Sequence, residues 1–260
     1  NYKDARVAYE KFVAGPEAKK HDKYRHAVNQ VIACRLRMGE HADALTFAKS
    51  RIEADKDTVW EGRSHRRYAN LLMAAPHWGM RRAGEFHRGK RGQGEYVRSF
   101  RKDRTEAIKH FEAARTIYQA TLADKNKLAE LPKEQQDKFL PEALECNFDL
   151  AGTLLRRGEN TQSWDWWDSF GEETEEFEEY EPGYGYRRRG VRGSNPPSGL
   201  RVDKKGNPIF TVEPKSYKAA LPDDQRVRFL LKEIEAKDPT PNNDMKALAI
   251  YRRAMVARAR

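Results

Sequence analysis

Two apolar stripes at helical spacing, separated by a single glycine, constrain the fold of this chain more than any other feature. The stripes are Val28, Val31, Ile32 and Leu36, then Ala44, Leu45, Ala48 and Ile52. Gly39 lies between them, where a residue free to take positive φ can end the first helix. Two amphipathic helices joined by so short a turn fold back as an antiparallel hairpin. We therefore expect Gly39 to be the turn, with Val31, Ile32, Leu45 and Ala48 packed between the two helices.

A related pattern recurs along the chain: a small residue followed one helical turn later by a bulky apolar one. Copies begin at Ala5, Ala44, Ala107 and Ala247, with a weaker one at Ser163. Such a pattern is typical of the second helix of a tetratricopeptide hairpin, although the copies lie farther apart than the roughly 34 residues of a regular repeat. The sequence therefore predicts an all-α fold. Degenerate tetratricopeptide-like helical hairpins stack as a superhelix in a single domain over residues 1–260.

Two long insertions interrupt the helical pattern, at residues 76–101 and 165–221. The first is rich in glycine, arginine and aromatic residues, which favours an ordered or semi-ordered loop over a helix. Asp103 is then expected to cap the next helix. The second insertion holds an acidic run at residues 172–181, followed by a segment rich in Tyr, Arg and Gly. Short β-type runs around a turn predict a small β-hairpin near residues 200–212.

Composition narrows the class of protein. The net charge is +10 and charged residues make up 35% of the chain, which favours acidic partners or a solvated helical surface. No run of eighteen apolar residues is present, so no membrane span is predicted. Cys34 and Cys146 are too few for a disulfide framework or a zinc site; buried free thiols are expected, with a single disulfide as the alternative. The chain begins inside a helical pattern at Asn1, as a segment of a longer polypeptide would.

Catalytic motifs do not emerge from the sequence. We find no nucleophile elbow, phosphate-binding glycine loop, His-Glu-x-x-His or Cys-x-x-Cys pattern. Glu85 and His87 offer two metal-ligand types in the same loop as His77, but a site needs a further ligand and a rigid frame. We expect these groups to form hydrogen bonds within the loop or to neighbouring helices. The prediction is therefore a protein that is not an enzyme, with no metal and no cofactor.

Candidate binding residues lie in the two insertions. Arginines among glycines can converge on an anion, and Arg, Tyr and Gly together resemble RNA-binding segments. The alternative is internal pairing with the acidic run at 172–181. Tryptophans in the second insertion form either a partner-binding patch or a core anchor. The candidates are Arg81, Arg82, Arg88, Arg91, Trp164, Trp167, Arg187, Arg188 and Arg189.

The insertions also carry a family resemblance. Residues 177–186, 202–210 and 214–220, together with 84–89, resemble the helical region that precedes the macroglobulin domains of large bacterial, planctomycete-type alpha-macroglobulin-like proteins. The resemblance covers roughly residues 60–235. It implies a large parent protein that is exported or held in the periplasm or cell envelope, whose relatives trap proteases. Neither Cys34 nor Cys146 lies in the Gly-Cys-Gly-Glu-Gln setting of the family's thioester, so no reactive thioester is implied here.

The resulting functional expectation is a non-catalytic structural or protein-interaction module of such a protein. Its partners would be neighbouring domains of the same polypeptide or another protein. The alternative is a helical-repeat protein that binds RNA or another polyanion through its Arg, Gly and aromatic loops. A steep fall of affinity with salt separates the second hypothesis from the first.

Overall fold

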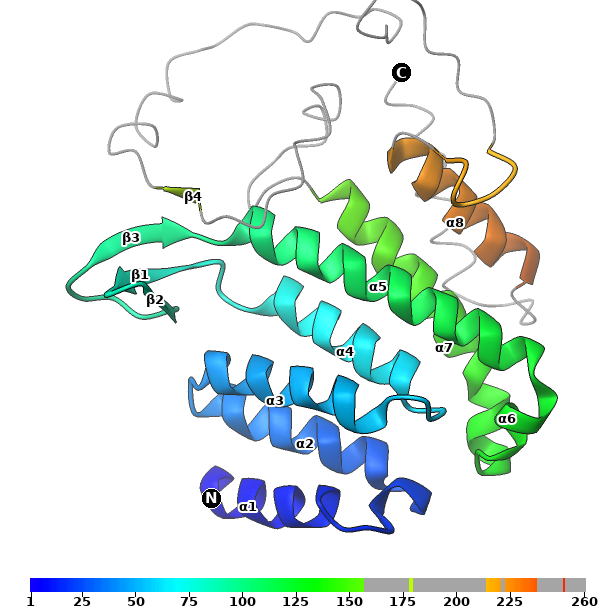
Figure 1. The fold of residues 1–260 in the computed structure, drawn as a ribbon, viewed down its shortest axis with the longest axis horizontal. Coiled ribbons are helices and arrows are strands. Elements are labelled where there is room, and N and C mark those ends of the chain that lie inside the picture. The colour runs from blue at the N-terminus through cyan, green and yellow to red at the C-terminus, as the bar shows by residue number, and fades with distance from the viewer. Residues whose placement is uncertain (157–177, 180–213, 221–222, 238–249, 251–260) are drawn as a thin grey trace, which may run out of the picture.

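The computed structural model describes residues 1–156, 178–179, 214–220, 223–237 and 250, and within these it is mostly helical with a small antiparallel sheet (Figure 1). The helices are α1 (Tyr2–Val13), α2 (Tyr24–Arg37), α3 (His41–Asp55), α4 (Glu61–Ala74), α5 (Phe100–Ala123), α6 (Lys125–Ala129), α7 (Lys133–Leu155) and α8 (Asp223–Lys237), with a 3-10 turn at Ala18–Lys20. The strands are β1 (Trp78–Arg82), β2 (Glu85–Arg88), β3 (Glu95–Arg98) and β4 (Glu178–Glu179).

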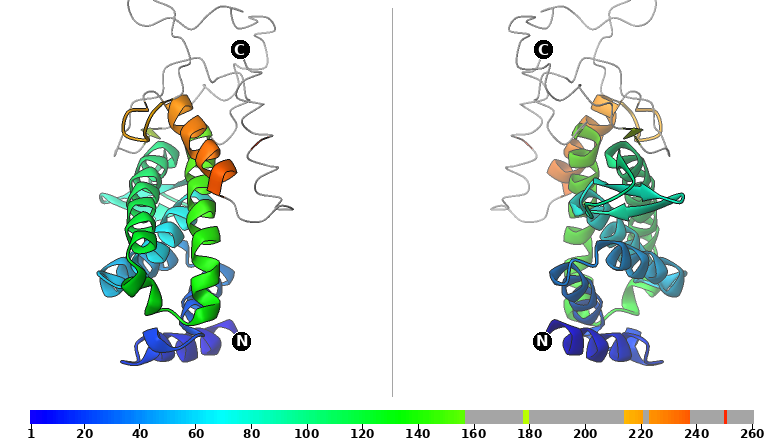
Figure 2. Two further views of the ribbon diagram at one scale, coloured as in Figure 1. Left: turned by 90° about the vertical axis from the view of Figure 1, so that its right-hand side faces the viewer. Right: turned by 90° about the vertical axis from the view of Figure 1, so that its left-hand side faces the viewer.

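The helices stack in chain order. Each of α1 to α4 packs on the helix that follows it, α5 packs on α7, and α7 packs on α8. Side views place α5 and α7 in different layers (Figure 2). Alanines at the contacts let the helix backbones approach closely, because their side chains are small and fully buried; they are Ala44, Ala69, Ala107, Ala114 and Ala151.

The hairpin around Gly39 has the predicted form. Gly39 has a φ of +74° and lies between the end of α2 and the start of α3. Its N–H donates to the carbonyl of Leu36 at 3.0 Å, and the N–H of Glu40 donates to that of Arg35 at 2.9 Å. This pair of bonds is the Schellman arrangement that closes a helix at a glycine. Residues Val31, Ile32, Leu45 and Ala48 are all buried, as expected.

The first insertion folds as a sheet, which the sequence did not predict. Strand order is β2-β1-β3-β4, and Met80 of β1 lies opposite His87 on one side and Tyr96 on the other. Gly79 allows the close approach of β2, since a Cβ there would lie 2.3 Å from the His87 carbonyl oxygen. The expectation of a non-helical ordered segment is correct. The β-hairpin expected near residues 200–212 lies outside the described residues.

Asp103 and the two cysteines are all buried. Asp103 does not cap α5: the helix begins at Phe100 with Ser99 at the N-cap position, and Asp103 is buried in its first turn. Cys34 and Cys146 are buried free thiols, and burial raises the pKa of Cys146 to about 12. Among the helices that the structure describes, none combines the length and apolar character that a membrane crossing requires.

Candidate functional site

The predicted binding arginines of the first insertion each have a separate contact within the fold. Arg81 pairs with Glu95 across the sheet at 2.7 Å, and Arg82 donates to the Gln93 carbonyl. The Arg91 guanidinium lies 6.0 Å from the centre of the Trp78 ring. These side chains do not converge on a common point. Trp164, Trp167, Arg187, Arg188 and Arg189 lie outside the described residues.

Arg88 belongs to a buried cluster that ties the sheet to α5. Its guanidinium donates to both oxygens of Asp103, at 2.6 and 2.8 Å. His77 Nδ1 lies 2.9 Å from Asp103, and the Ser99 hydroxyl donates to it at 2.7 Å. Burial alone would raise the pKa of Asp103, but these hydrogen bonds outweigh the effect of burial and lower the pKa. The serine bonds the aspartate instead of the histidine, so the three groups do not form a nucleophilic relay.

The acidic run also reaches this sheet. The backbone of β4 pairs with β3, with Glu179 opposite Val97 and Glu178 opposite Arg98. Part of the second insertion therefore lies along the edge of the first. Within the described residues, no group of three or more His, Cys, Asp or Glu side chains is arranged to hold a metal ion.

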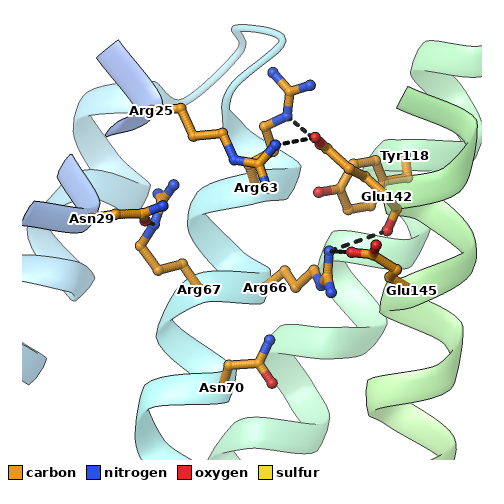
Figure 3. A pocket seen from close by; sticks show the side chains of 9 residues that line it. All are labelled: Arg25, Asn29, Arg63, Arg66, Arg67, Asn70, Tyr118, Glu142 and Glu145. Carbon is orange, nitrogen blue, oxygen red and sulfur yellow. Dashed lines mark hydrogen bonds and ion pairs between the residues drawn. The ribbon is translucent and has the colours of Figure 1, made fainter. Parts of the chain in front are cut away.

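A polar pocket opens between α2, α4 and α7 (Figure 3). Its volume is ≈ 230 Å³. Four arginines and two glutamates dominate its lining, which consists of Arg25, Asn29, Arg63, Arg66, Arg67, Asn70, Tyr118, Glu142 and Glu145. None of these residues was singled out by the sequence.

The α7 wall of the pocket is built from paired charges. Glu142 is buried and accepts from Arg63 Nε at 2.6 Å and from Arg25 Nη1. Arg63 is itself buried, and its guanidinium lies over the rings of Trp60 and Phe139, at 4.8 and 5.3 Å from their centres. These contacts hold α2, α4 and α7 together at one end of the pocket.

Arg66 completes this wall. It donates from Nε to Asp149 and from Nη1 to Glu145, both at 2.8 Å. Burial alone would lower the pKa of Arg66, but the neighbouring carboxylates outweigh burial and raise it. Asn70 adds a hydrogen bond to Asp149 at 2.9 Å. Each charge on this side of the pocket has an opposite charge in contact with it.

The α2 wall of the pocket differs from the α7 wall in that its arginine, Arg67, has no carboxylate partner among the described residues. Arg67 Nε donates to Asn29 Oδ1 at 2.7 Å, and within the described part of the chain Arg67 contacts no carboxylate. Burial, together with the positive charge of Arg25, lowers the pKa of Arg67 to about 10. An arginine with a lowered pKa carries a charge that its surroundings do not compensate.

A second pocket of ≈ 560 Å³ continues from the first. The two share Arg25, Asn29 and Glu142 in their linings. The second runs between the start of α2 and the start of α7, past Lys23, His26, Glu134, Gln135 and Lys138. We call the two pockets together the α2–α4–α7 groove.

The sequence held one weak signal of this groove. Arg63, Arg66 and Arg67 recur at spacings of three and four, which places them along one side of α4. On a single helix such residues are ordinarily a solvated face. Only the position of α2 and α7 on either side of α4 in the folded chain places them in a concave site.

Comparison of the chain with protein-family models, with curated proteins and with solved structures yields no match in any of the three.

Proposed function

We propose that this chain is a non-catalytic binding module of tetratricopeptide-like type, whose α2–α4–α7 groove holds a segment of a partner protein. One observation carries the proposal: the groove contains an arginine, Arg67, whose charge no carboxylate of the described chain neutralises. A partially buried charge of this kind is costly for folding alone. It becomes useful when an acidic ligand supplies the missing opposite charge.

The shape of the groove favours a peptide segment over a folded domain as the bound partner. Its two pockets follow one another between α2 and α7, with α4 lining the first of them. An extended or helical peptide can lie along such a path, whereas a globular surface cannot enter it. The partner is, by the family resemblance, a neighbouring domain of an exported alpha-macroglobulin-like protein or a second protein in the same compartment.

A second candidate function is binding of RNA or another polyanion through the first insertion. The net charge of +10 and the Arg91–Trp78 contact favour it, because basic and aromatic groups together stack on bases and pair with phosphates. Titration with heparin or single-stranded RNA at several salt concentrations tests it. Absence of binding at low salt would reject this candidate, and so would binding that survives alanine at Arg91 and at residues 187–189.

Selection from a random peptide library tests the groove. We expect the peptides selected on the wild-type protein to lose binding to an Asn29→Trp variant. Asn29 is exposed and lines both pockets, so a large side chain there obstructs the groove. A Thr46→Trp variant is the matched control, because Thr46 is exposed on α3 and lines neither pocket.

Two results would reject the groove as a binding site: selection that returns no peptide above background, or selected peptides that bind wild type and Asn29→Trp equally. Loss of binding to the Thr46→Trp control alone would place the binding surface on α3 instead.

A further inference from the structure

Arg67 presents unused hydrogen-bond donors to the groove. A guanidinium has five N–H groups, and the structure shows one of Arg67's, on Nε, bonded to Asn29. The two terminal nitrogens have no protein partner among the described residues. Asn29 accepts with its oxygen, so its NH₂ group remains a further donor at the same place. Arg67 of α4 and Asn29 of α2 therefore both line the pocket and carry donors that are bonded to no acceptor of the described chain.

Arg25 adds to the positive potential at this point. Its Nη1 is bonded to Glu142, while its side chain remains 41% exposed. The positive charges of Arg25 and Arg67 repel each other. Arg25 is also ion-paired with the buried Glu142. An anion bound beside Arg67 and Asn29 would offset this repulsion.

We propose that the pocket beside Arg67 is a site for one carboxylate of a peptide, which Arg67 and Asn29 bind and which Arg25 attracts. This inference rests on the proposed function and specifies the chemistry that the groove recognises. The carboxylate comes from an aspartate or glutamate side chain or from a chain terminus. The planar fork of a guanidinium matches the two oxygens of a carboxylate in either case.

The charges around the pocket favour a carboxylate over a phosphate. Glu142 and Glu145 line the same space as the four arginines, so the lining carries a modest positive excess. Arg25, Arg63 and Arg66 are already paired with these glutamates. The one uncompensated charge among the described residues of the lining, on Arg67, matches the single charge of a carboxylate, whereas a phosphate brings nearly two. The volume of ≈ 230 Å³ also suits one acidic side chain with a few waters of about 30 Å³ each.

Binding of labelled peptides, followed by fluorescence anisotropy at low salt, tests the proposal. The probes are an acetylated and amidated peptide of alternating Glu and Ser, its Gln counterpart, the Gln counterpart with a free carboxyl terminus, and a phosphoserine counterpart. We expect the Glu peptide or the free-terminus peptide to bind and the amidated Gln peptide not to bind. The first two probes distinguish a side-chain carboxylate from a terminal one.

Substitutions locate the site. Arg67→Gln should weaken binding of the carboxylate peptide by about tenfold or more, because it removes a charge-assisted hydrogen bond. Arg67→Lys keeps the charge but not the fork, and should weaken binding less. Arg37→Gln makes the same change of charge at an exposed position outside both pockets, and should leave affinity near that of wild type. Thermal unfolding verifies that each variant is folded.

Three results would overturn the carboxylate site: no binding of either carboxylate peptide, equal binding by Arg67→Gln and Arg37→Gln, or tighter binding of the phosphoserine peptide. The library selection separates this failure from failure of the groove. If the selected peptides still lose binding to the Asn29→Trp variant, the groove binds peptide segments, but Arg67 does not recognise a carboxylate on them.

Discussion

Arg66 and Arg67 are neighbours on α4, yet they reach opposite walls of the same pocket (Figure 3). Arg66 extends toward α7, where Asp149 and Glu145 accept its hydrogen bonds. Arg67 extends toward α2, where it finds the neutral amide of Asn29. The same residue type at consecutive positions therefore has two electrostatic states, one compensated within the fold and one not.

This difference separates two uses of a charged residue. Arg66, like the Arg63–Glu142 pair beside it, joins helices that are distant in the sequence. Arg67 joins α4 to α2 through one hydrogen bond to a neutral amide, and no carboxylate of the described chain offsets its charge. Residues kept for binding commonly reduce stability at the place where they act. We therefore expect substitutions on the α7 wall to damage the fold, and substitutions on the α2 wall to damage binding.

The largest effect should come from Glu142→Ala. Glu142 neutralises Arg63, and both side chains are buried. Its removal leaves a buried guanidinium without a carboxylate, which costs about 3–5 kcal/mol in comparable sites. Urea unfolding measures the loss. Glu134→Ala on the same helix is the control, because Glu134 is exposed and pairs only at the surface with Lys138. We expect no measurable change for the control, and equal losses for the two variants would contradict the compensated state of the α7 wall.

Arg66→Gln should have the next largest effect. It removes two charge-assisted hydrogen bonds at a side chain that is 16% exposed. A loss of about 1–3 kcal/mol is expected. Because Arg66 is not on the α2 wall, binding of the carboxylate peptide should change much less than stability. A variant with wild-type stability and lost binding would reverse the assignment of the two walls.

The regular parts of the fold could be predicted from local pattern. Gly39 and the stripes on both sides of it specify a hairpin, and α7 and α8 begin close to where turn and capping signals end. The sheet in the first insertion could not be predicted in the same way. Its strands are four or five residues long, and arginines and glycines obscure their alternation. The prediction of Asp103 as an N-cap is wrong because it relied on residue type alone. The partners of Asp103, Arg88 and His77, come from the preceding insertion.

The groove was missed for a different reason. The sequence draws attention to dense clusters of arginine, as in residues 81–91. The charges that matter in the groove are sparse in sequence and come together only when the helix stack places α2, α4 and α7 around one pocket. Whether an arginine is compensated depends on residues such as Asp149 or Asn29, which lie far from it in the chain. No local pattern carries that information.

A smaller effect on stability, dependent on pH, is expected from two histidines on another side of α4. His65 Nδ1 and His110 Nδ1 lie 2.8 Å apart, so one ring donates a proton and the other must accept it. Burial lowers the pKa of both, and the charge of His65 helps to bring that of His110 to about 4. Both values are below the ordinary value near 6.5, so the unfolded chain binds protons more readily than the folded chain.

Stability should therefore fall as the pH drops from about 6.5 toward 4, by roughly 1–2 kcal/mol after allowance for partial exposure. Urea unfolding between pH 7 and 5 measures this loss above the range in which most carboxylates titrate. A His65→Gln/His110→Gln double variant should lose the slope, and His21→Gln, at an exposed position, should keep it. A slope that persists in the double variant would assign the proton uptake to other groups.

The smallest change in stability is expected for Arg67→Gln, and it gives the sharpest test of the comparison. The substitution loses the hydrogen bond to Asn29 but also removes a partially buried charge beside Arg25. These effects oppose each other, so the free energy of unfolding should stay within about 1 kcal/mol of wild type. Added salt should stabilise wild type more than the variant, since it screens a repulsion that the variant lacks. A loss as large as that of Arg66→Gln would mean that Arg67 is compensated after all, and the two walls would no longer differ.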